Sequence, residues 1–329
     1  MDGLARGVIL SYHRITVPGP DPWGMRVTPA RFAAQMGVVA NCAEPVSLRE
    51  LASESSGTPQ HPVVAVTFDD GYLDNVIEGF PILDMHKVPA TIFVASGYTG
   101  QQHFWWDILE HVFLTPGTLP DHLTLSRHDR SLNLELGEAH HYSQAQYQQD
   151  CIHFQWKGKP GTRMRAYFQV HEYLSQFHVE ARIELSHEIL AWAGGARHAE
   201  EQIRITRPMS SQELIDISAN PLVSIGGHTV NHPILATLDP AHQTAEILGN
   251  KTYLESLLGI PVDTFAYPHG SVTDQALAAL KNGGFVAACT TRERAVTVGC
   301  SHLKLPRLTV KDWEADEFQQ RIEEVLFRR

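Results

Sequence analysis

Cysteine is scarce in this chain of 329 residues, and the few cysteines do not form a disulfide pattern. No two of them stand in C-x-x-C spacing, and their wide separation excludes the dense framework of small secreted domains. We therefore expect reduced thiols. The four positions are Cys42, Cys151, Cys289 and Cys300.

Basic residues are outnumbered by acidic ones. The chain has 26 Lys and Arg against 37 Asp and Glu, which gives a formal net charge of −11. Without a basic stripe, the sequence lacks the electrostatic footprint of a nucleic-acid-binding protein. It also offers no attraction for anionic lipid head groups. We expect neither nucleic acid nor a lipid surface as a partner.

Long apolar runs are missing as well. No stretch approaches the roughly 20 residues of a membrane span. The first predicted strand begins close to Met1, which leaves no room for the basic and apolar regions of a secretory leader. These absences predict a cytoplasmic protein, unless a leader has been removed from the natural chain. A chain of this length and ordinary apolar content can bury one large barrel core or two smaller cores.

Short apolar runs alternate with helical patterns along most of the chain. This alternation is typical of an α/β barrel. The predicted strands cover residues 62–68, 90–95, 222–227, 262–267 and 285–289, and the predicted helices cover residues 240–258, 271–280 and 316–327.

Two adjacent carboxylates follow the first of these strands, in Thr67-Phe68-Asp69-Asp70-Gly71-Tyr72. In an α/β barrel the carboxyl ends of the strands form the face on which active sites are built, and Gly71 allows the backbone to turn sharply there. A single Asp-Asp pair after a strand is also common as a solvated turn or a helix cap.

A histidine pair follows another strand, in His228-Thr229-Val230-Asn231-His232. One helical turn across this segment would place both imidazoles on the same side. Two histidines and one aspartate make a three-ligand, open-sided metal site of the hydrolytic kind. Zinc is the first expectation, and cobalt, nickel or manganese suit the same ligands. A histidine pair alone is often a coincidence, but its occurrence together with the two carboxylates favours a metal site.

The two motifs together resemble the first two signature motifs of the polysaccharide deacetylases, the NodB-homology group of carbohydrate esterases. The resemblance implies a deformed, TIM-like (β/α) barrel of seven or eight units. It also implies that Asp69 is the general base and that Asp70, His228 and His232 bind one divalent metal. The start of the chain, with Tyr12-His13, resembles the Tyr-His strand of one branch of the family, and residues 265–270 resemble its third motif.

The chain departs from the family pattern at two places. Many members have an arginine in the third motif that orients the base, whereas Ala266 stands here. Arg307, at the end of a late apolar stretch, is the expected substitute. The same stretch lacks the Leu-x-His motif that supplies the general acid. His13 is the preferred candidate for the acid because of its place at a strand end, and the other candidates are His269 and, more weakly, His302.

Amide hydrolysis defines what such a site has to provide. A bound divalent ion lowers the pKa of water, so that Asp69 can take its proton. The oxyanion needs a positive partner, for which we expect the metal and a backbone N–H in the turn Tyr267-Pro268-His269. The amine leaves only when it is protonated, and a histidine suits that step.

Residues 101–206 have a different texture from the predicted barrel, which covers residues 1–100 and 207–329. Helical spacing over residues 163–192 predicts one or two amphipathic helices, and we expect a helical insertion beside or over the barrel mouth. Its start contains Trp105 and Trp106, which either stack on sugar rings or anchor the inserted helices.

The sequence therefore favours metal-dependent removal of N-acetyl groups from an amino-sugar-containing molecule. The partner would be an N-acetylated sugar substrate, and Tyr267, Trp105 and Trp106 are the expected substrate-binding residues. Another N-acyl amidohydrolase, such as a deformylase, would use the same site. A third possibility is a non-catalytic, metal-containing carbohydrate-binding protein, although such a protein has no need of Asp69.

Overall fold

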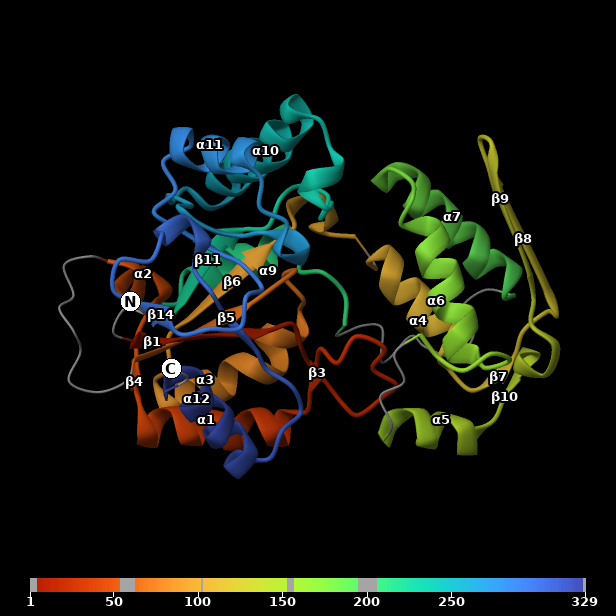
Figure 1. Ribbon diagram of the computed structural model, residues 1–329, viewed down its shortest axis with the longest axis horizontal. Helices are drawn as coiled ribbons and strands as arrows, with labels where there is room; N and C mark the ends of the chain where they lie inside the picture. Colours follow the sequence, from red (N-terminus) through yellow and green to blue (C-terminus); the bar gives the residue numbers. More distant parts are fainter. Residues whose placement is uncertain (1–4, 54–62, 102, 153–156, 195–205, 328–329) are drawn as a thin grey trace. The chain divides into compact units, whose positions relative to one another are not determined.

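The computed structural model describes residues 5–53, 63–101, 103–152, 157–194 and 206–327. The chain divides into two compact units (Figure 1). The barrel unit consists of Met1–Val17, Met25–Gln101 and Pro208–Arg329, and the insertion unit consists of Pro18–Gly24 and Gln102–Arg207. The sequence did not predict that the short segment Pro18–Gly24 belongs to the insertion unit.

A curled sheet forms the centre of the barrel unit (Figure 1). Its parallel strands follow the order β13-β12-β11-β6-β5-β1, and β14 pairs antiparallel with β1 at the end of that order. The short strand β15 pairs with β1, and the short strand β4 pairs with β5. The strands are β1 (Ala5–Tyr12), β4 (Glu44–Pro45), β5 (Val63–Phe68), β6 (Ala90–Val94), β11 (Val223–Gly227), β12 (Thr264–Ala266), β13 (Ala287–Cys289), β14 (Val296–Thr297) and β15 (Leu308–Thr309). The α/β barrel class is thereby confirmed.

The carboxyl ends of these parallel strands are the part of the fold that matters for the site. Strand β5 is buried along its whole length, as its uninterrupted apolar sequence requires of a parallel strand covered on both faces. The predicted strand included Pro62, which lies outside the described residues. In β1 the side chains alternate, so that Val8 and Leu10 belong to one cluster while Ile9 joins an inner cluster with Ala65. The barrel interior is therefore packed with side chains.

Helices surround the sheet, and α1, α3 and α12 cover one side of it (Figure 1). The long helix α10 begins at its cap Asp239 and ends at Gly259, whose φ of 67° suits glycine. Helix α11 begins after the predicted Ser271, because Thr273 accepts the N–H of Ala276 and acts as the cap. The helices are α1 (Pro29–Cys42), α2 (Leu48–Ala52), α3 (Phe80–His86), α9 (Ser211–Ser218), α10 (Pro240–Leu258), α11 (Asp274–Asn282) and α12 (Ala315–Phe327).

Short segments complete the barrel unit. The strand predicted at residues 285–289 forms only from Ala287, because Phe285 packs into the core beside Phe265 and is not paired in the sheet. The remaining elements are β2 (Arg14–Ile15), β3 (Arg26–Val27), the π-helix η1 (Asn75–Gly79), and the 3-10 turns η2 (Ser96–Tyr98), η4 (Leu235–Thr237), η5 (Pro268–Gly270) and η6 (His302–Lys304).

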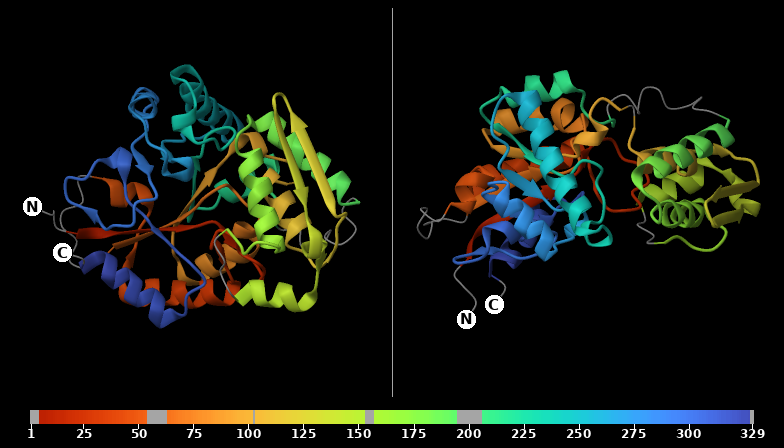
Figure 2. Two further views of the ribbon diagram at one scale, coloured as in Figure 1. Left: turned by 45° about the vertical axis from the view of Figure 1, so that its right-hand side comes forward. Right: turned by 90° about the horizontal axis from the view of Figure 1, so that it is seen from above.

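The insertion unit is not purely helical, which corrects the prediction. Strands β8 and β9 form a hairpin with a turn at His128, whose φ is 54° (Figure 2). Leu123 and Leu125 are buried on one face of β8, and this alternation in the sequence is the signal of a strand. The elements are α4 (Trp105–Phe113), β7 (Gly117–Thr118), β8 (His122–Arg127), β9 (Arg130–Glu135), η3 (Gly137–His140), β10 (His141–Tyr142), α5 (Gln144–Ile152), α6 (Arg163–Leu174) and α7 (Val179–Trp192).

Two further sequence predictions concern the chain as a whole. The four cysteines are free thiols. None of the helices in the described part of the chain combines the length and the apolar character that a transmembrane helix needs.

Candidate active site

The two carboxylates of the first motif lie directly after β5 and are almost completely buried, with exposures of 3% for Asp69 and 6% for Asp70. The chain turns through left-handed φ values at Asp70 (72°) and Gly71 (86°). Aspartate tolerates this conformation better than most residues, and a side chain at Gly71 would meet Val94 at 3.3 Å. The turn separates the two carboxylates, and each contacts a different set of partners.

Arg307 is the partner of Asp69. The guanidinium donates two parallel hydrogen bonds, from Nη1 to Oδ1 and from Nη2 to Oδ2, both 2.7 Å long. Arg307 is 1% exposed, and its Nε also donates to the carbonyl oxygen of Thr290. This contact agrees with the prediction that Arg307 replaces the arginine that is missing at Ala266.

The ion pair keeps Asp69 ionised. Burial acts to raise the pKa of this carboxyl group, but the charge of Arg307 and then that of His228 outweigh burial, so the pKa is lowered from its ordinary value. A carboxylate that is ionised and fixed in orientation can accept a proton, as a general base must.

His13 also lies near Asp69, in the chain between β1 and β2. Its Nε2 is 3.8 Å from Asp69 Oδ2, and its side chain is 16% exposed. Asn75, the first residue of the π-helix η1, donates from Nδ2 to the carbonyl oxygen of His13 at 2.8 Å. The sequence analysis did not single out Asn75, although its place five residues after Asp70 was a usable signal.

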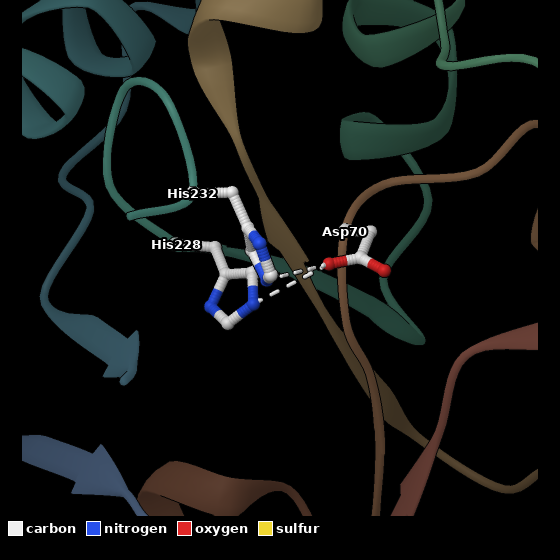
Figure 3. A group of neighbouring side chains, drawn as sticks. All are labelled: Asp70, His228 and His232. Carbon is white, nitrogen blue, oxygen red and sulfur yellow. Dashed lines mark ion pairs between the residues drawn. The ribbon is translucent and has the colours of Figure 1, made fainter. Parts of the chain in front are cut away.

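Asp70 faces the two histidines of the second motif (Figure 3). Its Oδ1 lies 3.5 Å from His228 Nε2 and 3.3 Å from His232 Nε2. Two ligand atoms about 2.0–2.1 Å from a tetrahedral zinc ion are separated by about 3.3 Å, so this spacing fits a common metal. Asp70 Oδ1 is also buried without a hydrogen-bond partner in the described part of the chain. The three residues therefore fit a divalent ion.

Backbone contacts prepare His228 for that role. Its Nδ1 lies 2.7 Å from the carbonyl oxygen of Ala266, which accepts the Nδ1 proton and leaves the Nε2 lone pair toward Asp70. Burial acts to lower the pKa of His228, but Asp70 and Asp69 raise it above its ordinary value. Burial lowers the pKa of His232 well below its ordinary value. The carboxylates therefore favour positive charge on His228, whereas burial favours the neutral form of His232.

The segment from His228 to His232 is a loop, so the predicted helical turn is wrong. Thr229 and His232 have φ values of 63° and 53°, which a right-handed helix excludes. The loop nevertheless brings the two imidazole rings together, with centroids 4.9 Å apart.

The other candidates for the general acid lie elsewhere in the barrel unit. His269 is exposed, and its ring centroid is 4.8 Å from that of His232. His302 begins the 3-10 turn η6. Of the three candidates, the structure places His13 beside Asp69 and His269 beside a candidate metal ligand.

Tyr267 does not have the substrate-binding role that the sequence suggested. Its side chain is completely buried, and its hydroxyl group donates to the carbonyl oxygen of Leu303. Its backbone N–H donates to the carbonyl oxygen of Cys289. Pro268 has no N–H, so His269 has the remaining backbone N–H of the turn Tyr267-Pro268-His269 that could donate to an oxyanion.

Trp105 is a core residue, which corrects its assignment to sugar stacking. It is 4% exposed and lies against His171 and under the guanidinium of Arg182. Trp106 is half-buried and stacks on Phe104, with ring centroids 4.5 Å apart. All of these contacts lie within the insertion unit, and only Trp106 is retained as a candidate for sugar binding.

Comparison with known proteins agrees with this site. Residues 56–148 and 178–288 match the family model of the polysaccharide deacetylases, and the match covers more than half of the chain. The chain belongs to the polysaccharide deacetylase family. Within this family, 98 residues of the chain are 32% identical to YxkH, a protein of Bacillus subtilis (strain 168) assigned to the polysaccharide deacetylases. That alignment covers 29% of the chain and 34% of the relative, so the chain matches about a third of the length of that protein.

Solved structures of other proteins share the fold. The deacetylase PplD from Streptococcus pyogenes, solved in complex with acetate, has a TM-score of 0.56 and 19% identity, and the superposition covers 97% of this chain and 99% of PplD. IcaB from Ammonifex degensii has a TM-score of 0.58 and 18% identity, with 99% and 98% of the two chains covered. At these identities the likeness establishes the (β/α)-barrel fold.

Proposed function

We propose that this deacetylase-family protein is a metal-dependent hydrolase that removes N-acetyl groups from an amino-sugar-containing glycan or glycoconjugate. The observation that carries the proposal is the group formed by Asp70, His228 and His232 beside the Arg307–Asp69 ion pair. Membership of the family supports the same reaction.

Asp70, His228 and His232 would hold one divalent ion, with zinc as the first candidate and cobalt, nickel or manganese as others. When bound, such an ion lowers the pKa of water and polarises the acyl oxygen. The histidines offer Nε2 and the aspartate offers Oδ1, which are the atoms that converge in Figure 3.

Asp69 would act as the general base. It takes a proton from the attacking water while the new C–O bond forms at the acyl carbon. Arg307 holds both carboxylate oxygens and so fixes the direction in which Asp69 accepts that proton. The N–H of His269 is the backbone donor that we assign to the developing oxyanion.

His13 would act as the general acid. The C–N bond breaks as the imidazole delivers a proton to the leaving nitrogen, which gives a free amine and acetate. His13 is the preferred candidate because its Nε2 lies 3.8 Å from Asp69 Oδ2, and Asn75 holds its backbone. Trp106 is the residue of the insertion unit that we assign to sugar binding.

The other hypotheses differ from this proposal in testable ways. Another N-acyl amidohydrolase, such as a deformylase, would use the same residues on a different acyl group. A non-catalytic binding protein would keep the metal ligands without needing the buried ion pair. A buried, fully hydrogen-bonded Arg–Asp pair is costly to form, and its presence beside the ligand group favours catalysis.

Metal content tests the ligand assignment. His228→Ala and His232→Ala each remove one of three ligands, so both purified proteins should contain far less than one equivalent of metal per chain and should be inactive. Inductively coupled plasma mass spectrometry measures the metal, and release of acetate from an N-acetylated chito-oligosaccharide measures the activity. His242→Ala, an exposed histidine on α10, is the matched control and should retain the metal. Near-stoichiometric metal in both ligand variants would exclude the assignment.

The leaving group tests the role of His13. His13→Ala should lower kcat/KM for an N-acetyl amino sugar by about 10² or more. The same variant should hydrolyse 4-nitrophenyl acetate almost normally, because an aryl oxide leaves without being protonated. His269→Ala serves as the comparison. If His269→Ala loses amide hydrolysis but keeps ester hydrolysis, and His13→Ala does not, His269 is the general acid.

A further inference from the structure

The loop that carries His228 and His232 adopts a backbone conformation that it would not maintain alone. Thr229 and His232 are both non-glycine residues with positive φ, and Thr229 is β-branched, which makes this conformation unusual for it. Such residues persist where surrounding contacts fix them. The loop positions two of the three candidate metal ligands, so the contacts that fix it also determine the ligand geometry.

One side chain of helix α10 makes a concentrated set of these contacts. Glu246 Oε2 accepts the backbone N–H groups of Val230 and Asn231 at 2.9 Å and 2.8 Å. Its Oε1 accepts Nδ2 of Asn231 at 2.7 Å. A single carboxylate thus satisfies three donors in the segment between the two histidines.

Other groups also hold the loop. Asn250 donates to the carbonyl oxygen of Thr229, and Gly97 donates its N–H to the carbonyl oxygen of Val230 at 2.7 Å. A side chain on Gly97 would come within 2.8 Å of Val230 O and Asn231 Oδ1, so the loop is closely packed on this side. Movement of the loop is therefore limited by close packing at Gly97 and by hydrogen bonds with Asn250 and Glu246 of α10.

We propose that Glu246 is a positioning residue for the metal site, which sets metal affinity by fixing the backbone between His228 and His232. Glu246 lies in the first half of helix α10, and its side chain forms hydrogen bonds with Val230 and Asn231, between the two histidines. It acts through the backbone N–H groups of Val230 and Asn231. The inference rests on the proposed metal site and adds a residue that the sequence analysis did not identify.

The chemistry of the contact explains why a carboxylate is needed. Glutamine has the same shape, but one of its two terminal groups is an NH₂ donor. Either orientation of that amide brings a donor against N–H donors of the loop. Aspartate keeps the charge but is shorter by one methylene group, so its oxygens cannot reach the same donors from the same helix position. The two substitutions therefore separate hydrogen bonding from charge.

The test measures zinc affinity directly. Metal-stripped wild-type, Glu246→Gln and Glu246→Asp proteins are titrated with zinc against a chromophoric chelator. We expect Kd to rise about tenfold to a hundredfold in both variants, which is the usual scale for groups that orient metal ligands. Activity at saturating zinc should return close to the wild-type value, because the chemical groups are intact. Circular dichroism of the metal-free proteins establishes that each variant is folded, and Glu246→Asp carries the test if Glu246→Gln does not fold.

Glu255→Gln is the matched control, because it removes one negative charge from the same helix. The Glu255 carboxylate contacts Lys251 and the N–H of Val262 and lies away from the loop. This variant should bind zinc within about twofold of wild-type. Wild-type affinity in Glu246→Asp would show that charge alone matters and would overturn the proposal, as would wild-type affinity in Glu246→Gln. If the wild-type protein itself bound no zinc, the metal site and this inference would both be rejected. If the wild type bound zinc and the Glu246 variants had the same Kd, only the inference would be rejected.

Discussion

Replacing Asp69 by asparagine is expected to lower kcat for deacetylation by a factor on the order of a hundred or more, while the protein keeps its metal. Asparagine retains the shape of the side chain and one oxygen acceptor, but it cannot take a proton from water. The proposed metal ligands are Asp70 and the two histidines, whereas Asp69 contacts Arg307. Loss of the base should therefore affect chemistry and not occupancy.

Acetate release and metal analysis on the same preparation measure the two properties. Asp70→Asn is the comparison, because it changes the neighbouring carboxylate in the same turn and should lose metal together with activity. Melting temperature is a necessary third measurement, since Asp69→Asn leaves the buried Arg307 without its ionic partner. If Asp69→Asn lost metal to the same extent as Asp70→Asn, Asp69 would be a ligand. Unchanged activity would reject the mechanism.

The parts of the site that the sequence predicts are those fixed by strand ends. Asp69 and Asp70 follow an apolar run, His228 follows another, and parallel strands in a barrel bring these ends to one face. Arg307 is 238 residues from Asp69 in the chain and yet bonded to it, and it lies directly before β15. This contact was expected from the family resemblance, because Ala266 stands where many members have the arginine that orients the base.

Side-chain direction is less accessible from the sequence. Tyr267 stands one residue beyond the end of β12, but its ring enters the core beside Phe265 and its hydroxyl group reaches Leu303. A shift of one residue along a strand reverses the face to which a side chain points. The motif around Tyr267 therefore predicted the position of this residue at a strand end, but not that its side chain points into the core.

Loop conformation and remote support are also hidden from sequence patterns. The spacing of His228 and His232 equals one helical turn, yet Glu246 and Asn250 stabilise a loop with two left-handed residues. Likewise, Trp23 of the segment Pro18–Gly24 packs on Tyr167 in the insertion unit, through a contact between distant parts of the chain that leaves no local pattern. Both features depend on tertiary contacts, which a periodicity cannot encode.

Arg307→Ala is expected to damage both stability and activity more severely than other single changes outside the metal ligands. The substitution leaves Asp69 buried without its cation, and breaking a buried pair in this way typically costs about 3–5 kcal/mol. Burial, no longer opposed by the guanidinium, would raise the pKa of Asp69 and favour the protonated form, which cannot act as a base. Activity should fall below detection even where the protein remains folded.

Two further variants separate the orienting role of Arg307 from its charge. Arg307→Lys keeps the cation but replaces two parallel hydrogen bonds by a point charge, so it should recover much of the stability and only a small part of the activity. The double variant Asp69→Asn with Arg307→Ala should be more stable than Arg307→Ala alone, because no unpaired buried charge remains. Chemical denaturation of the wild type, Asp69→Asn, Arg307→Ala and the double variant gives the coupling energy between the two residues. If the double variant were as unstable as the sum of its single changes, the pair would not be coupled, and Arg307 would be a packing residue and not the group that orients the base.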